Sequence, residues 1–198
     1  MGKELTSDII ISPVGRLTWT HIFEKTTFRN IPPEKQKYSA IVLFKKDAPG
    51  LREMKQVCKD LIIKRWGSRP GNFLSPFRPV EERFFELGFN SEDNQINFKS
   101  SDIPAALFTT KDGHNKYNRI TRPTDLYPGC YVRVSHNYYT YENLSVGINA
   151  GLKSIQKMKD GTPIELRTGS SPDDDFADLP PEYAALSEDP FENDLDDI

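Results

Sequence analysis

The sequence predicts a small, mainly β domain with one main helix, followed by an acidic tail. Several short apolar runs are separated by turns rich in Pro, Gly and Asn, which is typical of short strands. One longer segment instead repeats its apolar residues at helical spacing. From residue 168 onwards the composition changes to Ser, Pro, Asp and Glu, as in disordered tails. We therefore expect a folded domain over residues 1–167 and a disordered acidic tail over residues 168–198.

Three strands are expected in the first quarter of the chain, at Asp8–Ile11, Val14–Phe23 and Tyr38–Lys45. In the second of these, simple alternation puts Leu17, Trp19 and His21 on one side. Asn30, Pro32 and Pro33 predict a loop between the second and third strands.

The main helix is expected directly after the third strand. Asp47 is a plausible N-cap with Pro49 in the first turn, and the helix runs to about Trp66, where Gly67 stops it. Its buried stripe consists of the apolar residues at helical spacing, namely Leu51, Met54, Cys58, Leu61 and Ile62.

The remaining elements complete a β-rich pattern. The segment Gly67–Pro79 holds three prolines and two glycines, which predicts an irregular binding loop rather than a regular element. Further strands are expected at Gln95–Lys99 and Pro104–Thr110, and a long hairpin at Cys130–Tyr141 and Ser145–Lys159. Strands grouped around one helix indicate a small barrel or a strongly bent sheet. Among barrels of this size, the five-stranded OB-fold suits the strand count and a nucleic-acid ligand.

The charge distribution points to a polyanionic ligand. Of the 29 acidic residues, eleven lie between Pro172 and Ile198, where there is no Lys or Arg. Residues 1–171 contain the other 18 acidic residues and all 26 basic residues, so their net charge is +8, although the net charge of the whole chain is −3. A basic body joined to an acidic tail indicates that the body binds a polyanion, and that the tail covers the site or recruits partners in its absence.

One face of the first hairpin strand has the chemistry of an unpaired nucleic-acid site. Alternation puts Tyr131, Arg133, Asn137, Tyr139 and Tyr141 on that face. Bases stack on tyrosine rings, while Arg and amide groups hold phosphates or base edges. The alternative is that these tyrosines are simply good strand formers at a half-buried surface.

A second candidate surface combines aromatic and basic residues of the Pro/Gly-rich loop with positive charge from the connection before the hairpin. Its members are Arg69, Phe73, Phe77, Arg78, Lys111 and Lys116. The alternative for the two phenylalanines is that they tuck the loop onto the barrel.

No pattern in the sequence indicates catalysis. There is no phosphate-binding GxxxxGK[ST] loop, no GxSxG and no HExxH. The two cysteines, Cys58 and Cys130, have no metal-ligand spacing to each other or to histidines, which favours a reducing, cytoplasmic setting. We expect a non-catalytic protein without metal or cofactor, and with no membrane association, because no apolar run is long enough to span a bilayer.

The tail places apolar residues among its acids, a pattern that can dock into a partner's basic-rimmed pocket. The residues expected to do so are Asp173, Asp174, Asp175, Phe176, Phe191, Asp194, Asp196, Asp197 and Ile198. The alternative is a tail that only increases solubility.

The hairpin motifs resemble a known family. The segments Tyr127–Arg133, Asn137–Tyr139 and Gly147–Leu152 are similar to those of the small single-stranded DNA-binding proteins of tailed phages, and the resemblance covers about residues 14–160. It implies an OB-fold that binds single-stranded DNA without sequence preference in phage DNA replication, repair or recombination. An acidic tail is usual in such proteins and implies a DNA polymerase or other replication and recombination proteins as partners.

Three alternatives stay open from the sequence. The protein is an interaction adaptor whose acidic tail is the active element, a nuclease or annealing enzyme with an unrecognised site, or a binder of RNA rather than DNA.

Overall fold

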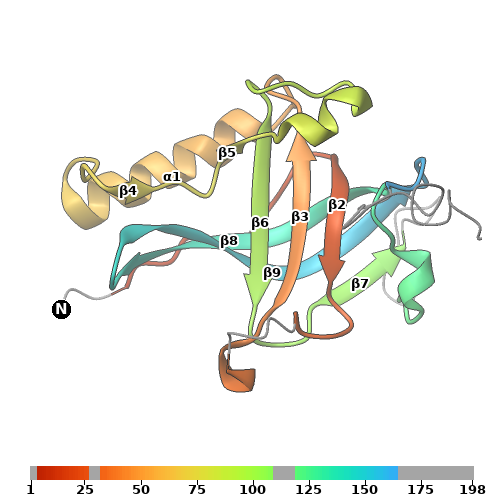
Figure 1. Ribbon diagram of the computed structural model, residues 1–198. Helices are drawn as coiled ribbons and strands as arrows, with labels where there is room; N and C mark the ends of the chain where they lie inside the picture. The colour runs from red at the N-terminus through yellow and green to blue at the C-terminus, as the bar shows by residue number, and fades with distance from the viewer. Residues whose placement is uncertain (1–3, 27–31, 109–118, 165–198) are drawn as a thin grey trace, which may run out of the picture. The chain divides into compact units, whose positions relative to one another are not determined.

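The computed structural model describes residues 4–26, 32–108 and 119–164 (Figure 1). The expected acidic tail, the domain boundary at residue 167, and the candidate residues Lys111 and Lys116 lie outside these ranges. The described part is mainly β with one long helix, as the sequence predicts.

Five strands follow one another around a ring: β2 (Gly15–His21), β3 (Tyr38–Phe44), β6 (Asn94–Ser100), β9 (Val146–Lys159) and β8 (Tyr131–Glu142). All neighbours in the ring are antiparallel except β6 and β9, which run parallel. The β6–β9 and β8–β2 junctions consist of only two residue pairs each. The ring is therefore a strongly bent, partly open sheet rather than a fully bonded barrel, and the expected OB-fold-like class is confirmed.

Shorter elements are attached to the ring. The strands are β1 (Ile10–Ile11), β4 (Phe73–Leu74), β5 (Arg78–Pro79) and β7 (Ala105–Phe108), and the 3₁₀ helices are η1 (Pro33–Lys35), η2 (Glu82–Leu87) and η3 (Pro123–Asp125). Strand β1 pairs with β8, β4 and β7 pair with β9, and β5 pairs with β6. The segment Gly67–Pro79 is thus not wholly irregular, because β9 and β6 offer it edges to pair with at two points.

The helix α1 (Leu51–Trp66) begins later than expected. Gly50 precedes it with a φ of 91°, a left-handed conformation that glycine adopts at little cost and that cannot continue into a helix. Asp47 therefore lies in a turn before the helix and does not cap it. The end of the helix is as predicted, since the Gly67 N–H donates to the Ile63 carbonyl at 2.9 Å.

The apolar stripe of α1 closes the interior of the ring. Leu51, Met54, Cys58 and Leu61 are buried, as predicted, while Ile62 is half-buried. Cys58 contacts Tyr138 of β8 within the core, and burial raises the pKa of both groups. The helix thus packs on the inward-facing side chains of the sheet.

A β-bulge reverses the side chains of β2. Leu17 pairs with Val42 and Trp19 pairs with Ile41, so Thr18 is an extra residue. Leu17 consequently points into the core, whereas Trp19 lies on the outer face with Ile41. The prediction that Leu17 shares a side with Trp19 and His21 is wrong, because simple alternation does not anticipate the bulge.

The predicted alternation of β8 is confirmed. Its inward residues Val132, Val134, His136, Tyr138 and Thr140 are fully buried. Their neighbours on the outward face are half-buried, except Asn137, which is 8% exposed.

Candidate nucleic-acid interface

The register of the ring aligns five outward side chains in one row across five strands. Trp19 of β2 pairs with Ile41 of β3, and Ile41 pairs with Asn97 of β6. Asn149 of β9 lies one position before the β6–β9 pairs, which puts it beside Asn97, and it pairs with Tyr139 of β8. The row therefore has an aromatic ring at each end and two amides between them.

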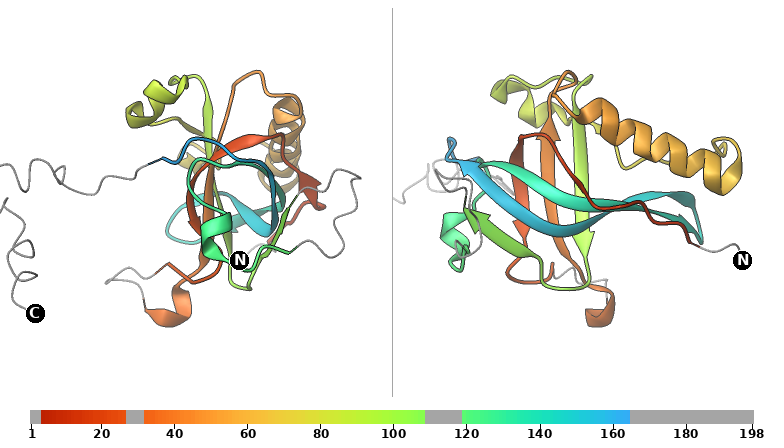
Figure 2. Two further views of the ribbon diagram at one scale, coloured as in Figure 1. Left: turned by 90° about the vertical axis from the view of Figure 1, so that its right-hand side faces the viewer. Right: turned by 180° about the vertical axis from the view of Figure 1, so that it is seen from behind.

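This row forms the floor of a groove with a volume of about 480 Å³. We call it the sheet groove; it is lined by Trp19, Thr26, Lys35, Gln36, Lys37, Ser39, Ile41, Arg83, Asn97, Lys99, Tyr139 and Asn149. Figure 2 (left) shows η1 and η2 projecting from the same side of β3 and β6, at opposite ends of these strands, with α1 on the other side. The groove thus opens on the face of the sheet that the helix leaves uncovered.

One rim of the sheet groove is fixed by the connection between β2 and β3. The Thr26 N–H donates to the Lys37 carbonyl at 3.1 Å, and the Thr26 and Ser39 hydroxyls are 3.1 Å apart. These bonds hold the ends of the connection together and keep Lys35 and Lys37 at the groove.

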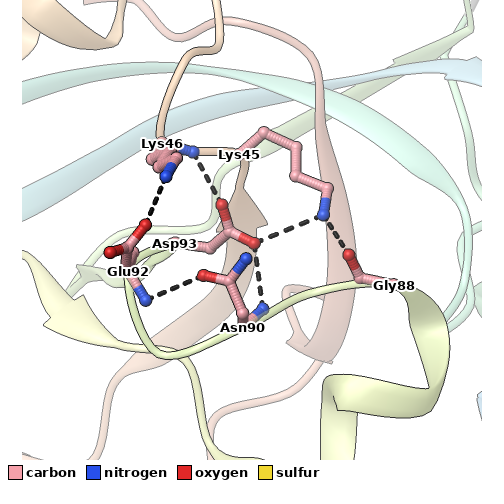
Figure 3. Close-up of polar contacts among 6 residues, drawn as sticks. All are labelled: Lys45, Lys46, Gly88, Asn90, Glu92 and Asp93. Carbon is pink, nitrogen blue, oxygen red and sulfur yellow. Dashed lines mark hydrogen bonds and ion pairs between the residues drawn. The ribbon is translucent and has the colours of Figure 1, made fainter.

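The opposite rim, which carries Arg83 on η2, is tied to β3 by a buried carboxylate (Figure 3). Asp93 accepts hydrogen bonds from the Lys46 N–H at 2.8 Å, the Asn90 N–H at 3.0 Å and the Lys45 ammonium at 3.3 Å. Burial alone raises the pKa of Asp93, but these bonds outweigh it and the pKa lies below its ordinary value. Lys45 also donates to the carbonyl of Gly88, the residue after η2, which fixes the position of that helix.

The sheet groove carries positive charge that the described acids do not neutralise. Lys35, Lys37 and Lys99 are exposed and form no ion pair with an acid of the described ranges, while Arg83 pairs with Glu81 at 2.9 Å. The pKa of Lys99 is lowered, first by partial burial of its ammonium and then by the charges of Arg78 and Lys37. Like charges that crowd together in this way are stabilised by a bound anion.

The aromatic ends of the row remain half-buried, with part of each ring accessible from the groove. Trp19 packs at 4.7 Å from the His21 ring, tilted by 41°. Tyr139 forms a side-chain hydrogen bond with Asn149, and burial is the main cause of its raised pKa. Two separated rings on a basic floor have the chemistry that holds unstacked bases between phosphate contacts.

Of the residues singled out from the sequence, three lie in or beside the sheet groove. Tyr139 lines it directly. Asn137 belongs to the next row, opposite Gly151, and its Oδ1 atom would meet a Cβ at that glycine at 2.5 Å. Arg78 pairs with Gln95 of β6, two residues before Asn97 on the same face.

The other three residues of the β8 face lie elsewhere. Tyr131 lines a separate groove, where its ring lies 4.6 Å from the Arg16 guanidinium and 4.4 Å from the Lys159 ammonium. Arg133 donates from Nε to Gln156 at 2.6 Å. Tyr141 packs over the backbone of Gly147, on the β8–β9 hairpin beyond the ring.

The residues of the Pro/Gly-rich loop line a third groove, against α1. Phe73 and Phe77 are both half-buried and pack against the core, so they tuck the loop onto the domain. Arg69 is exposed and its guanidinium lies 5.2 Å from the centre of the Phe73 ring.

Sequence reasoning missed Asn149, Lys37, Trp19, Asn97 and Lys99. For the last two the signal was present, because Gln95, Asn97 and Lys99 alternate with Ile96 and Phe98 along one strand. For Trp19 there was none, since its face depends on the bulge.

The described residues contain no cluster of His, Cys, Asp or Glu that could hold a metal ion. Within the same ranges, no helix has both the length and the apolar character needed to cross a bilayer. The lining of the sheet groove consists mainly of aromatic rings, amides and cations.

Solved structures of other proteins share this fold. The C-terminally truncated single-stranded DNA-binding protein of bacteriophage Enc34 has a TM-score of 0.62 and 20% identity, covering 79% of this chain and 88% of that one. The same phage protein in complex with single-stranded DNA has a TM-score of 0.56 and 20% identity, covering 79% of this chain and 89% of that one. The single-stranded DNA-binding protein gp2.5 of bacteriophage T7 has a TM-score of 0.55 and 11% identity, covering 83% of this chain and 99% of that one.

These structural likenesses support the fold. No curated protein matches the chain. The model of one family, described as the ssDNA-binding protein of Enterobacter phage Enc34, matches residues 7–189, which is most of the sequence. The chain belongs to this family of phage single-stranded DNA-binding proteins.

Proposed function

We propose that this protein binds single-stranded DNA in the sheet groove, without catalysis, during phage DNA replication, repair or recombination. The observation that carries the proposal is the row from Trp19 to Tyr139, flanked by Lys35, Lys37 and Lys99 with no described acidic partner. It lies on the face that OB-folds use for oligonucleotides. The Enc34 protein, similar in fold, has been solved with single-stranded DNA, which supports the same ligand class here.

In this proposal the two kinds of side chain have different tasks. Lys37, Lys99 and Arg78 contact phosphates, so the affinity falls with salt by a slope of about 0.7 per phosphate on single strands. Trp19 and Tyr139 stack on bases, which every base accepts equally, and the binding therefore has no strong sequence preference. Lys111 and Lys116, outside the described residues, are predicted to add further phosphate contacts.

The positions of Tyr131, Arg133 and Tyr141 support a secondary part for them. Each already has a neighbour that holds it: two cations for Tyr131, Gln156 for Arg133 and Gly147 for Tyr141. We expect Tyr131→Ala and Arg133→Ala to weaken DNA binding less than changes in the sheet groove do. In this proposal these three residues contact DNA only when the bound DNA strand is long enough to extend along β8.

The acidic segment 172–198 is proposed to compete with DNA for the basic groove. When DNA binds, the segment becomes available to a DNA polymerase or another replication or recombination protein in the host cytoplasm. Its eleven acids and the +8 charge of residues 1–171 support this competition. Deleting residues 172–198 should strengthen binding of an oligo-dT strand, and an unchanged or weaker affinity would refute the competition.

The proposal is tested by fluorescence anisotropy of a labelled oligo-dT strand and of a duplex, across a salt series, with the full chain. We expect tight, salt-sensitive binding of the single strand over the duplex, and weaker binding by a Lys37→Ala/Lys99→Ala variant. Lys64→Ala is the matched control, since this exposed lysine lies on α1, away from the groove. Equal affinity of the double variant and the control would refute the site, and competition with a matched RNA strand separates DNA from RNA.

A further inference from the structure

The groove between α1 and segment 69–77, described above as the third groove, is also basic. It has a volume of about 270 Å³. We call it the α1 groove; it is lined by Lys55, Cys58, Lys59, Ile62, Arg69, Phe73, Ser75, Pro76, Phe77 and Asn94. Its lining contains three cations, two aromatic rings and no acidic residue.

The cations of the α1 groove lie over its apolar floor. The Lys55 ammonium is 5.7 Å from the centre of the Phe77 ring, and the Arg69 guanidinium is 5.2 Å from that of Phe73. Lys59 is exposed on the same stretch of α1. None of the three forms an ion pair with a described acid, so they can offer their charge to an incoming carboxylate.

The α1 groove is not a continuation of the sheet groove. Phe77 lies against Tyr138, at 6.0 Å between ring centres, and Tyr138 points inward from β8. Tyr139, the next residue, points outward into the sheet groove. Figure 2 (left) shows α1 on the opposite side of β3 and β6 from η1 and η2, so a strand held in the sheet groove does not reach it directly.

The rings of the α1 groove are also poorly placed to stack on bases. A base stacks on an open aromatic face, and here a cation already lies over one face of each ring. Phe73 further packs edge-on against Trp66, at 6.0 Å and 78°. The groove therefore presents positive charges around a small apolar hollow. Such a site suits a peptide in which one apolar side chain enters the hollow and carboxylates on either side of it contact the cations.

From this we propose that the α1 groove binds an acidic peptide segment of a partner protein, with one aromatic side chain inserted between Phe73, Phe77 and Ile62. The volume of the groove suits one side chain rather than a nucleotide or a small-molecule ligand. Lys55, Lys59 and Arg69 pair with the flanking carboxylates. The proposal is independent of DNA binding in the sheet groove.

The probe is a fluorescein-labelled synthetic peptide in which one phenylalanine is flanked on both sides by aspartates, with a sequence that does not occur in this chain. It is titrated with the full chain and followed by anisotropy. We expect saturable binding that weakens at least about tenfold when Lys55 and Lys59 are both changed to alanine. A Lys55→Arg/Lys59→Arg variant should restore it, and Lys64→Ala, on the same helix but outside the groove, should bind as the unaltered chain does.

Two altered peptides separate the parts of the proposal. Replacing the peptide's phenylalanine by alanine, or its aspartates by asparagine, should each reduce binding. The proposal is overturned if the peptide does not bind, or if Lys64→Ala weakens binding as much as the double variant. It is equally overturned, in favour of a DNA path, if the double variant loses oligo-dT affinity to the same extent as the Lys37→Ala/Lys99→Ala variant. The peptide and oligo-dT are measured separately, so a negative result with the peptide leaves the proposed DNA binding in the sheet groove untouched, and the reverse also holds.

Discussion

Replacing Trp19 with alanine is the sharpest test of how the sheet groove holds a strand. The indole forms one end of the cross-strand row, lies on the outer face and is only half-buried. Stacking of a base on such a ring contributes about 1–3 kcal/mol. The dissociation constant for oligo-dT should therefore rise by about 5- to 150-fold. Because an uncharged side chain is lost, the slope of log affinity against log salt should stay unchanged.

The assay is anisotropy of labelled oligo-dT across a salt series, with unfolding by urea measured for each variant to establish that it is folded. Trp66→Ala provides the matched control. Trp66 is the second tryptophan of the chain, but it packs edge-on against Phe73 beside α1 rather than in the sheet groove. We expect this control to lose stability while keeping its DNA affinity.

Three results would refute the reasoning. A folded Trp19→Ala variant that binds as tightly as the unaltered chain would show that no base stacks there. A fall in the salt slope would mean that the substitution disturbs phosphate contacts instead. An equal loss of affinity in Trp66→Ala would locate the DNA on the α1 side of the sheet.

Three further predictions concern single residues. Lys99→Ala should reduce the salt slope by about 0.7 if its ammonium contacts one phosphate, and an unchanged slope contradicts that contact. Burial lowers the pKa of His136 to about 4. As the pH falls below 6.5, this histidine is therefore protonated in the unfolded chain before it is protonated in the folded one. The free energy of unfolding should then fall by up to about 1.4 kcal/mol per pH unit until about pH 4. Urea unfolding at pH 7 and pH 5 should show this loss in the unaltered chain and a smaller one in His136→Leu. Phe98→Ala should cost about 3–5 kcal/mol in the same assay, because the ring is fully buried against Phe44 and His136; a cost below 1 kcal/mol would contradict this packing.

The parts of the fold that depend on local pattern could be predicted from the sequence. Alternation along β8 correctly gave its outward face, and helical spacing gave the buried stripe of α1. Glycine at position 67 correctly marked the end of the helix. At its beginning Asp47 was misleading, because a side chain suited to capping says nothing about the left-handed glycine that lies three residues further on.

The candidate site could not be predicted in the same way, because it depends on the register of five strands that are far apart in the sequence. Trp19 and Tyr139 are separated by 119 other residues, and they come into one row only through four successive strand pairings. A single extra residue, Thr18, decides which face Trp19 occupies. Neither fact leaves a mark in composition or spacing.

The position of the helix explains why the ligand face is where it is. The apolar stripe of α1 is buried against the inward residues of the ring, such as Tyr138 next to Cys58. The outer faces of β3 and β6 consequently lie on the side that α1 leaves uncovered, and Asn97 and Lys99 are exposed there. The α1 groove lies on the side of α1, where segment 69–77 lines it together with the helix before β5 pairs with β6. One packing requirement thus separates two basic surfaces, and we expect each to have its own ligand.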